Sequence, residues 1–340
     1  MREKPAISDE LIISRLQEEY NLTATSLTFL PIGADVGSVA YRVVSDNGTA
    51  YFLKLRKTFM EISVTVPLFL KSQGIQEIIA PFETKSKQGW ADFGEYKMIL
   101  YPFIDGKDGF EMVLSDRHKR TLGAALKKIH SAHPPLELKR HIPQETFSPT
   151  YRESMRSLQE QVEHQRFNEP IAAKLAKFIR SERETISHLI HRAEELALKL
   201  RSQHLEFVPC HTDIHGGNMF FSDKGEFYIV DWDNPLLAPK ERDLMFIGGG
   251  VDWIWQSPHD EAEFYAGYGK TEIDLTILAY YRYERIIQDL VAYSEFLLST
   301  EEGGTDREPA YTAFRSNFEP GQTIEIAHRT DLGIETKNFR

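Results

Sequence analysis

The first hundred residues carry short runs of alternating apolar and polar positions, which predict a small antiparallel sheet preceded by one helix. Ser8 precedes two acidic residues and an apolar face, so a helix is expected from Ser8 to about Tyr20. The pair Asn47-Gly48 is typical of a two-residue hairpin turn. The predicted strands are residues 27–30, 39–44 and 50–55, a segment around Ile78, and residues 96–101.

From Ser115 onward the apolar positions repeat at helical spacing, as in Leu122, Leu126 and Ile129. The longest helix is expected over residues 171–202, with a charged outer face. Shorter helices are predicted over residues 151–165 and from residue 239 to 246. A sheet-rich beginning followed by a helical remainder indicates an α+β fold.

Composition limits the possible partners. The chain has 340 residues, of which 41% are hydrophobic and 27% charged, which is typical of a globular protein with a large core. Its single cysteine fits a reducing cytoplasm, and no apolar run approaches the roughly 18 residues of a membrane span. The net charge of -11 argues against a nucleic-acid partner, because phosphate binding requires clustered Lys and Arg. We therefore expect a cytoplasmic protein that attracts a small cation.

The chemistry is concentrated in the stretch from His211 to Asn218, which reads His-Thr-Asp-Ile-His-Gly-Gly-Asn, and in Asp231, which closes an apolar run. In phosphoryl transfer, one carboxylate orients the attacking hydroxyl and accepts its proton, while an Asn and a second Asp hold Mg²⁺ against the nucleotide phosphates. Asp213 is assigned the first role, and Asn218 with Asp231 the second.

The residues between Asn218 and Asp231 support this assignment. Two short apolar runs, residues 219–222 and 226–230, are joined by the turn sequence Asp-Lys-Gly at 223–225, which predicts a hairpin. Such a hairpin would bring Asn218 and Asp231 side by side.

Other interpretations of this stretch are weaker. His211, Asp213 and His215 alternate and are residue types that bind zinc or iron. A binuclear hydrolase would need further clusters, and the chain offers only scattered residues such as His130 and His133.

Cys210 lies next to His211, but adjacency in sequence does not place a base against a sulfur. Cys210 is expected to be a buried small residue. His211 is expected to pack the loop as a structural residue, and the role of His215 stays open.

A glycine-containing loop, residues 31–38, separates the first two predicted strands. Gly33 and Gly37 would let backbone amides approach phosphate oxygens, and Ser38 would add a hydroxyl contact. Lys54 lies at the centre of the third predicted strand.

The order His-x-Asp-x-x-x-x-Asn, a hairpin and a strand-ending Asp resembles the protein-kinase-like fold as found in aminoglycoside phosphotransferases and choline kinases. The resemblance implies two lobes: a nucleotide-binding lobe over residues 1–104, which includes the hinge, and a helical lobe over residues 105–340 with the catalytic loop and the substrate pocket. It also implies Mg²⁺-dependent use of ATP, with GTP left open. A protein kinase is disfavoured because Trp-Asp-Asn-Pro follows Asp231.

The same resemblance assigns further roles. Lys54 corresponds to the lysine that grips the α- and β-phosphates, and Glu61 to its expected ion-pair partner. Asp243 resembles the structural Asp that braces the catalytic loop. The hinge that binds adenine would comprise Leu100, Tyr101 and Phe103, because the intervening Pro102 has no amide hydrogen.

Residues 229–235 and 238–246 are similar to the branch of this family that phosphorylates spectinomycin. The expected reaction is therefore transfer of the γ-phosphoryl group of ATP to a hydroxyl of that small cationic antibiotic. A kinase for choline, methylthioribose or another small metabolite is the alternative within the fold, and a nucleotide-binding module without catalysis is the alternative of another class. Carboxylates beside aromatic rings suit a diamine, and the candidates for the acceptor pocket are Asp252, Trp253, Tyr283 and Glu284.

Overall fold

The computed structural model describes residue 4 and residues 6–32, 37–251, 254–299 and 304–338. The chain forms two compact units, each discontinuous in sequence. The first unit comprises residues 1–143 and 211–236, and the second comprises residues 144–210 and 237–340. The sequence-based lobes, 1–104 and 105–340, divide the chain at a single point, whereas the first unit also includes the stretch around Asp213.

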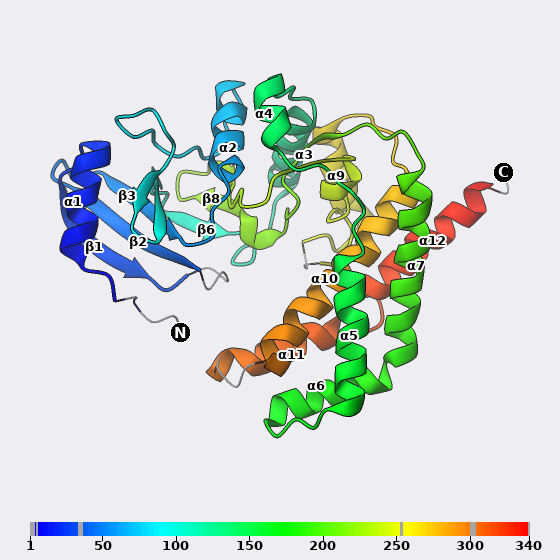
Figure 1. Cartoon of the computed structure of the whole chain (residues 1–340). Coiled ribbons are helices and arrows are strands. Elements are labelled where there is room, and N and C mark those ends of the chain that lie inside the picture. The colour runs from blue at the N-terminus through cyan, green and yellow to red at the C-terminus, as the bar shows by residue number, and fades with distance from the viewer. Residues whose placement is uncertain (1–3, 5, 33–36, 252–253, 300–303, 339–340) are drawn as a thin grey trace. The chain divides into compact units, whose positions relative to one another are not determined.

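The first unit contains a five-stranded antiparallel sheet in the order β1-β2-β3-β5-β4, of which β1, β2 and β3 are labelled in Figure 1. The strands are β1 Ala24–Leu30, β2 Ser38–Ser45, β3 Ala50–Arg56, β4 Ala91–Phe93 and β5 Tyr96–Pro102. The strands predicted over residues 27–30, 39–44, 50–55 and 96–101 are confirmed. Ile78 instead forms an isolated parallel bridge with Ile229, and the three-residue β4 was missed.

Helix α1, Asp9–Tyr20, is confirmed and covers one face of this sheet. The Ser8 hydroxyl accepts the Leu11 N–H at its start, and Asn21 ends it in a left-handed conformation with φ 54°. Ile12 and Leu16 pack against alternate residues of the strands, including Tyr41 and Leu55. Alternation at a period of two therefore puts one face of each strand into the core and leaves the other for polar side chains.

The rest of the first unit comprises helices α2 Ile62–Ser72, α3 Asp116–His130 and α4 Leu136–His141, and a second sheet of three strands. In that sheet β8 Met219–Ser222 pairs with both β6 Gly106–Asp108 and β9 Phe227–Ile229. The β8–β9 pairing confirms the predicted hairpin. Pro67 lies buried inside α2 and does not end the helix.

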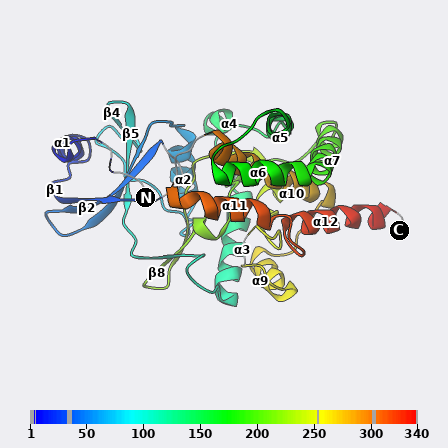
Figure 2. The same ribbon diagram turned by 90° about the horizontal axis from the view of Figure 1, so that it is seen from below.

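The second unit is helical and is built on α10, Leu275–Ser299. The other helices are α5 Thr150–His164, α6 Pro170–Ser181, α7 Arg183–Arg201, α8 Glu241–Leu244, α9 Pro258–Tyr268, α11 Arg307–Ser316 and α12 Thr323–Asn338. Helices α6 and α11 lie beside α10 (Figure 2). Short strands β7 Val208–Cys210 and β10 Leu236–Ala238 pair with each other.

Two helix predictions were wrong in extent. The single helix expected over residues 171–202 is two helices, α6 and α7, which separate at Glu182. Because no Gly or Pro marks this break, the sequence gives no stop signal there. The helix expected from residue 239 to 246 is the one-turn α8, which begins three residues after the end of β10 and ends at Leu244.

Cys210 is fully buried at the end of β7, where its thiol contacts the carbonyl oxygen of Ala238 at 3.7 Å. Burial raises the pKa of this thiol well above its usual value. Over the described ranges, every helix is too short or too polar to cross a lipid bilayer.

Candidate active site

His211 fixes the start of the loop that carries Asp213. Its ring is 1% exposed and packs edge-on against Trp232, with ring centroids 4.6 Å apart. The Nδ1 atom accepts the backbone N–H of Asp213 at 3.3 Å, so Nε2 carries the proton and donates to the carbonyl oxygen of Val230 at 2.9 Å. This one imidazole ties the loop to the end of the β8–β9 hairpin.

Two non-glycine residues at the site adopt left-handed backbone conformations. Thr212 has φ 78° and Asp231 has φ 64°. The Thr212 hydroxyl donates to the carbonyl oxygen of Asn234 at 3.1 Å, which holds this β-branched residue in place. Such conformations cost free energy and persist where the surroundings enforce them. Here they turn the chain sharply beside Asp213 and at Asp231.

The carboxylate of Asp213 is 40% exposed and lies 3.4 Å from Nε2 of His215. The His215 ring stacks on Phe110, with centroids 5.6 Å apart, and its Nδ1 accepts the N–H of Gly217 at 3.0 Å. His215, whose role the sequence left open, is therefore a neighbour of the Asp213 carboxylate.

Asn218 ends the short 3₁₀ helix Gly216–Asn218 and is largely buried. Its Nδ2 donates to the backbone carbonyl of Asp213 at 2.9 Å, so the side-chain oxygen is the atom left for another ligand. The N–H of Val230 donates to the Asn218 carbonyl at 3.0 Å, so the hairpin brings Asn218 next to the residue before Asp231. An amide oxygen and a half-exposed carboxylate fit a hard divalent cation such as Mg²⁺.

Lys54 joins β3 to the end of the hairpin. Its Nζ lies 2.9 Å from Asp231 Oδ1 and 3.1 Å from Asp233 Oδ2. Arg56 Nη1 lies 2.5 Å from Asp233 Oδ1. Residues two apart on a strand share a face, so Lys54 and Arg56 point the same way from β3. The sequence analysis did not identify Asp233 or Arg56 as site residues. Asp233 lies two positions after Asp231, and Arg56 lies two positions after Lys54.

The two carboxylates differ in acidity. Burial raises the pKa of Asp233, and the attraction of Lys54 offsets this effect only in part, so its pKa lies above the usual value. Burial acts on Asp231 as well, but there Lys54, together with Asp233 and His211, outweighs it and the pKa lies below the usual value. Asp231 is therefore the member of the pair that stays ionised to lower pH.

The other nucleotide-site candidates are placed as follows. Glu61 is exposed just before α2, and the carboxylates that contact Lys54 within the described ranges are those of Asp231 and Asp233. The carbonyl of Gly37 accepts the N–H of Lys57 at 2.9 Å. Ser38 begins β2 opposite Arg56. Gly33 lies outside the described residues.

The hinge candidates belong to the end of β5. The Leu100 carbonyl accepts the N–H of Phe82 at 2.7 Å, and the Phe103 N–H donates to Ala50 at 3.4 Å. Burial raises the pKa of the Tyr101 phenol, and the nearby Asp233 adds to this shift. The long bond from Phe103 leaves its N–H weakly held.

The acceptor-pocket candidates in the second unit have partners of their own. The Tyr283 hydroxyl donates to Asp331 Oδ2 at 3.1 Å, and the ring is 1% exposed. Glu284 forms an ion pair with the buried Arg152. Both therefore contribute to packing around α10. Asp243 is fully buried in α8, and Asp252 and Trp253 lie outside the described residues.

An antiparallel sheet that presents a lysine, a loop with Asp and Asn, and a hairpin that ends in Asp define a nucleotide-dependent phosphotransferase with a kinase-like fold. The chain belongs to the phosphotransferase enzyme family, whose model matches residues 28–285. It is an ATP-dependent phosphotransferase with an alcohol group as acceptor.

Comparison with solved structures shows which members of this family the chain is similar to. The chain is similar to spectinomycin phosphotransferase APH(9)-Ia in complex with ADP and spectinomycin, with 35% identity over 96% of this chain and 99% of that chain and a TM-score of 0.88. For the AMP-bound complex of the same enzyme the identity is 34%, over 95% and 98% of the two chains, with a TM-score of 0.83. Choline kinase LicA from Streptococcus pneumoniae shares the fold at 16% identity over 89% and 96% of the chains, with a TM-score of 0.56.

Proposed function

We propose that this enzyme transfers the γ-phosphoryl group of ATP to a hydroxyl of spectinomycin and so acts as an antibiotic-resistance phosphotransferase. The observation that supports the acceptor is the 35% identity to spectinomycin phosphotransferase over nearly the whole of both chains. The net charge of -11 suits a cationic acceptor.

Asp213 is the proposed catalytic residue. Its carboxylate is accessible, and its backbone is held by His211 and Asn218. In the proposed reaction it orients the acceptor hydroxyl and accepts its proton, and His215 at 3.4 Å holds the carboxylate in position. Asp243 is proposed to brace this loop.

Asn218 and Asp231 are the proposed ligands of Mg²⁺. A bound divalent ion would neutralise charge on the nucleotide phosphates. Two features of these residues suit such an ion. The amide oxygen of Asn218 accepts no hydrogen bond within the described ranges, and the carboxylate of Asp231 has a lowered pKa.

Lys54 is proposed to bind the α- and β-phosphates, with Asp231 and Asp233 rather than Glu61 as its ion-pair partners. Gly33, Gly37 and Ser38 would cover the phosphates. Adenine would bind the backbone of Leu100, Tyr101 and Phe103, where the weakly held N–H of Phe103 is a suitable donor.

An acceptor screen tests the proposal. Labelled ATP or GTP is incubated with spectinomycin, choline, methylthioribose or ethanolamine, with Mg²⁺ or with a chelator, and the phosphorylated product is identified by NMR. We expect transfer to spectinomycin with ATP and Mg²⁺, and background transfer with chelator. Faster transfer to a metabolite than to spectinomycin would replace the proposed acceptor, and ATP binding without transfer to any acceptor would contradict catalysis.

A further inference from the structure

The second unit contains a cavity that none of the roles above uses. It has a volume of about 650 Å³ and lies among α9, α10, α12 and residues 247–248 and 255–258. Pockets that bind small molecules have volumes of roughly 300–1,000 Å³. The cavity is therefore large enough for a compact polar molecule.

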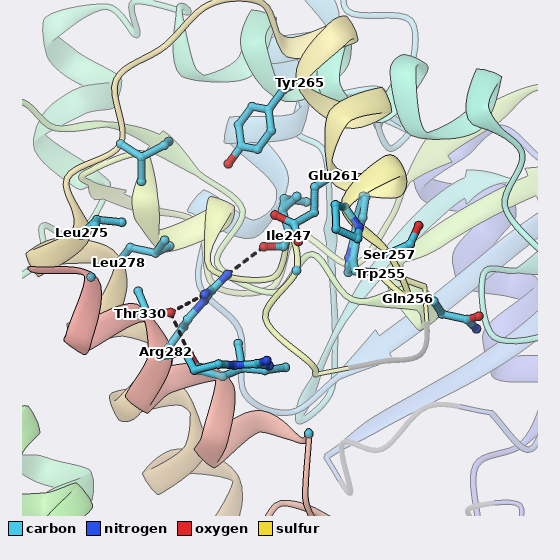
Figure 3. A pocket seen from close by; sticks show the side chains of 17 residues that line it. Ile247, Trp255, Gln256, Ser257, Glu261, Tyr265, Leu275, Leu278, Arg282 and Thr330 are labelled. Atoms are coloured by element: carbon cyan, nitrogen blue, oxygen red, sulfur yellow. Dashed lines mark hydrogen bonds between the residues drawn. The ribbon is translucent and has the colours of Figure 1, made fainter. Parts of the chain in front are cut away.

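Glu261 of α9 lines this cavity, and the charged group that attracts its carboxylate is Arg282 of the same cavity. The described residues offer its side chain neither a hydrogen bond nor an ion pair, and Figure 3 shows it facing the same space as Arg282 and Tyr265. Burial raises the pKa of Glu261, and the attraction of Arg282 offsets only part of this. A half-buried carboxylate without a hydrogen bond is costly to keep ionised, and a cationic ligand would lower that cost.

Gly248 allows this placement of Glu261. The glycine has φ +64°, and a Cβ atom there would lie 2.4 Å from Oε1 of Glu261. The carboxylate thus packs directly on the backbone at the cavity wall.

Arg282 closes the opposite side of the cavity. Its Nη1 donates to the Thr330 hydroxyl at 2.6 Å and its Nη2 to the Ile247 carbonyl at 2.9 Å (Figure 3). A guanidinium has five N–H groups, and with Nε directed at the Met245 carbonyl two of them have no acceptor within the described ranges. A ligand oxygen is the natural acceptor for these donors.

Two aromatic residues complete the lining. The Tyr265 hydroxyl points toward Glu261 and Arg282 (Figure 3) and has no hydrogen-bond partner within the described ranges. Trp255 is 9% exposed, and no acceptor for its Nε1–H lies among the residues that the structure describes. Buried donors are normally satisfied, so the Trp255 N–H at this cavity indicates a ligand, and the half-buried Tyr265 hydroxyl is available beside it.

We propose that this cavity binds a small amino-polyol, with Glu261 accepting its protonated amine and Tyr265, Trp255 and Arg282 contacting its hydroxyl oxygens. The ligand class rests on the proposed function, because an aminocyclitol antibiotic has this chemistry. The Glu261 carboxylate would bind the amine of the ligand. The N–H and O–H donors that face this carboxylate would bind the hydroxyl oxygens of the ligand.

Isothermal titration calorimetry without nucleotide tests the proposal, with spectinomycin and glucosamine as probes. Glu261→Gln should weaken binding of the amine at least about tenfold, because it removes a charge-assisted hydrogen bond. Tyr265→Phe should weaken it several-fold. The matched control is Glu272→Gln, which makes the same change at an exposed position before α10 and should bind like the wild type. Thermal unfolding checks that each variant is folded.

The outcomes separate this proposal from the proposed function. Binding that depends on Glu261 but is not followed by phosphorylation of spectinomycin would refute the acceptor and support the cavity. Phosphorylation of spectinomycin with unchanged affinity in Glu261→Gln would support the acceptor and overturn the cavity proposal. Failure of the wild type to bind either probe would also overturn it.

Discussion

The ammonium group of Lys54 lies 2.9 Å from Oδ1 of Asp231, although 177 positions separate the two residues in the chain. This contact joins the central strand of the sheet to the end of the β8–β9 hairpin. It also places the proposed phosphate-binding cation against the proposed metal ligand. A nucleotide with its cation would therefore bind at a site where the chain's own charges are already arranged.

Lys54→Met is expected to raise the KM for ATP by roughly ten- to a hundredfold, because it removes a charge-assisted contact to phosphate. It should also raise the pKa of Asp231, since Lys54 is the main group that lowers that pKa. Steady-state kinetics at several pH values measure both effects. Lys57→Met, at an exposed lysine paired with Glu95, is the control and should leave the KM unchanged.

Asp213→Asn is expected to lower kcat by roughly a hundred- to ten-thousandfold with little change in ATP affinity, because the amide cannot accept the proton. Single-turnover kinetics and ATP titration measure the two quantities. Near-normal turnover would exclude Asp213 as the base.

Asp233→Asn should lower the free energy of unfolding by about 1–3 kcal/mol, because it weakens the ion pairs with Lys54 and the largely buried Arg56. Urea unfolding measures this change. Asp223→Asn makes the same substitution at an exposed position of the hairpin turn and should be near neutral. Equal effects of the two variants would show that Asp233 has no structural role.

Glu284 makes stability depend on pH. Burial raises its pKa to about 7 in spite of the nearby Arg152. Because the folded-state pKa lies above the unfolded value, the stabilising contribution is complete below about pH 4.5 and is lost as pH rises through about 7. Glu284→Gln should therefore flatten the fall in unfolding free energy between these pH values, an effect of up to roughly 3 kcal/mol. An unchanged slope in the variant would contradict the assignment.

Gly248→Ala tests how closely Glu261 packs on the backbone. The new Cβ would lie 2.4 Å from the carboxylate, and φ +64° adds backbone strain. Gly225→Ala shares the positive φ but has open space around it, so it isolates the strain, which costs about 1–2 kcal/mol. Thermal unfolding of both variants should show the larger loss for Gly248→Ala. Equal losses would mean that the Glu261 side chain moves away freely.

The elements near the site were predictable because their signals are local. Asn47-Gly48 marks one turn, Asp223 to Gly225 mark another, and period-two alternation marks the strands. The spacing from Asp213 to Asn218 and the hairpin then fix the proximity of Asn218 and Asp231.

Other features depend on tertiary contacts that no local pattern encodes. Asp233 acquires its partners only when β3 comes next to the hairpin. The break at Glu182 lacks any residue that stops a helix. Glu284 is a candidate for the acceptor pocket in the sequence, and only the fold shows that Arg152 is paired with it.

The burial of Cys210 has a practical consequence. The chain has no other cysteine, and this one is 0% exposed with a thiol that resists ionisation. Thiol-reactive dyes or spin labels should therefore modify an engineered surface cysteine selectively without first removing the native one. Positions such as Lys224 in the hairpin turn and Glu272 before α10 are exposed attachment points from which ligand binding can be followed by spectroscopy.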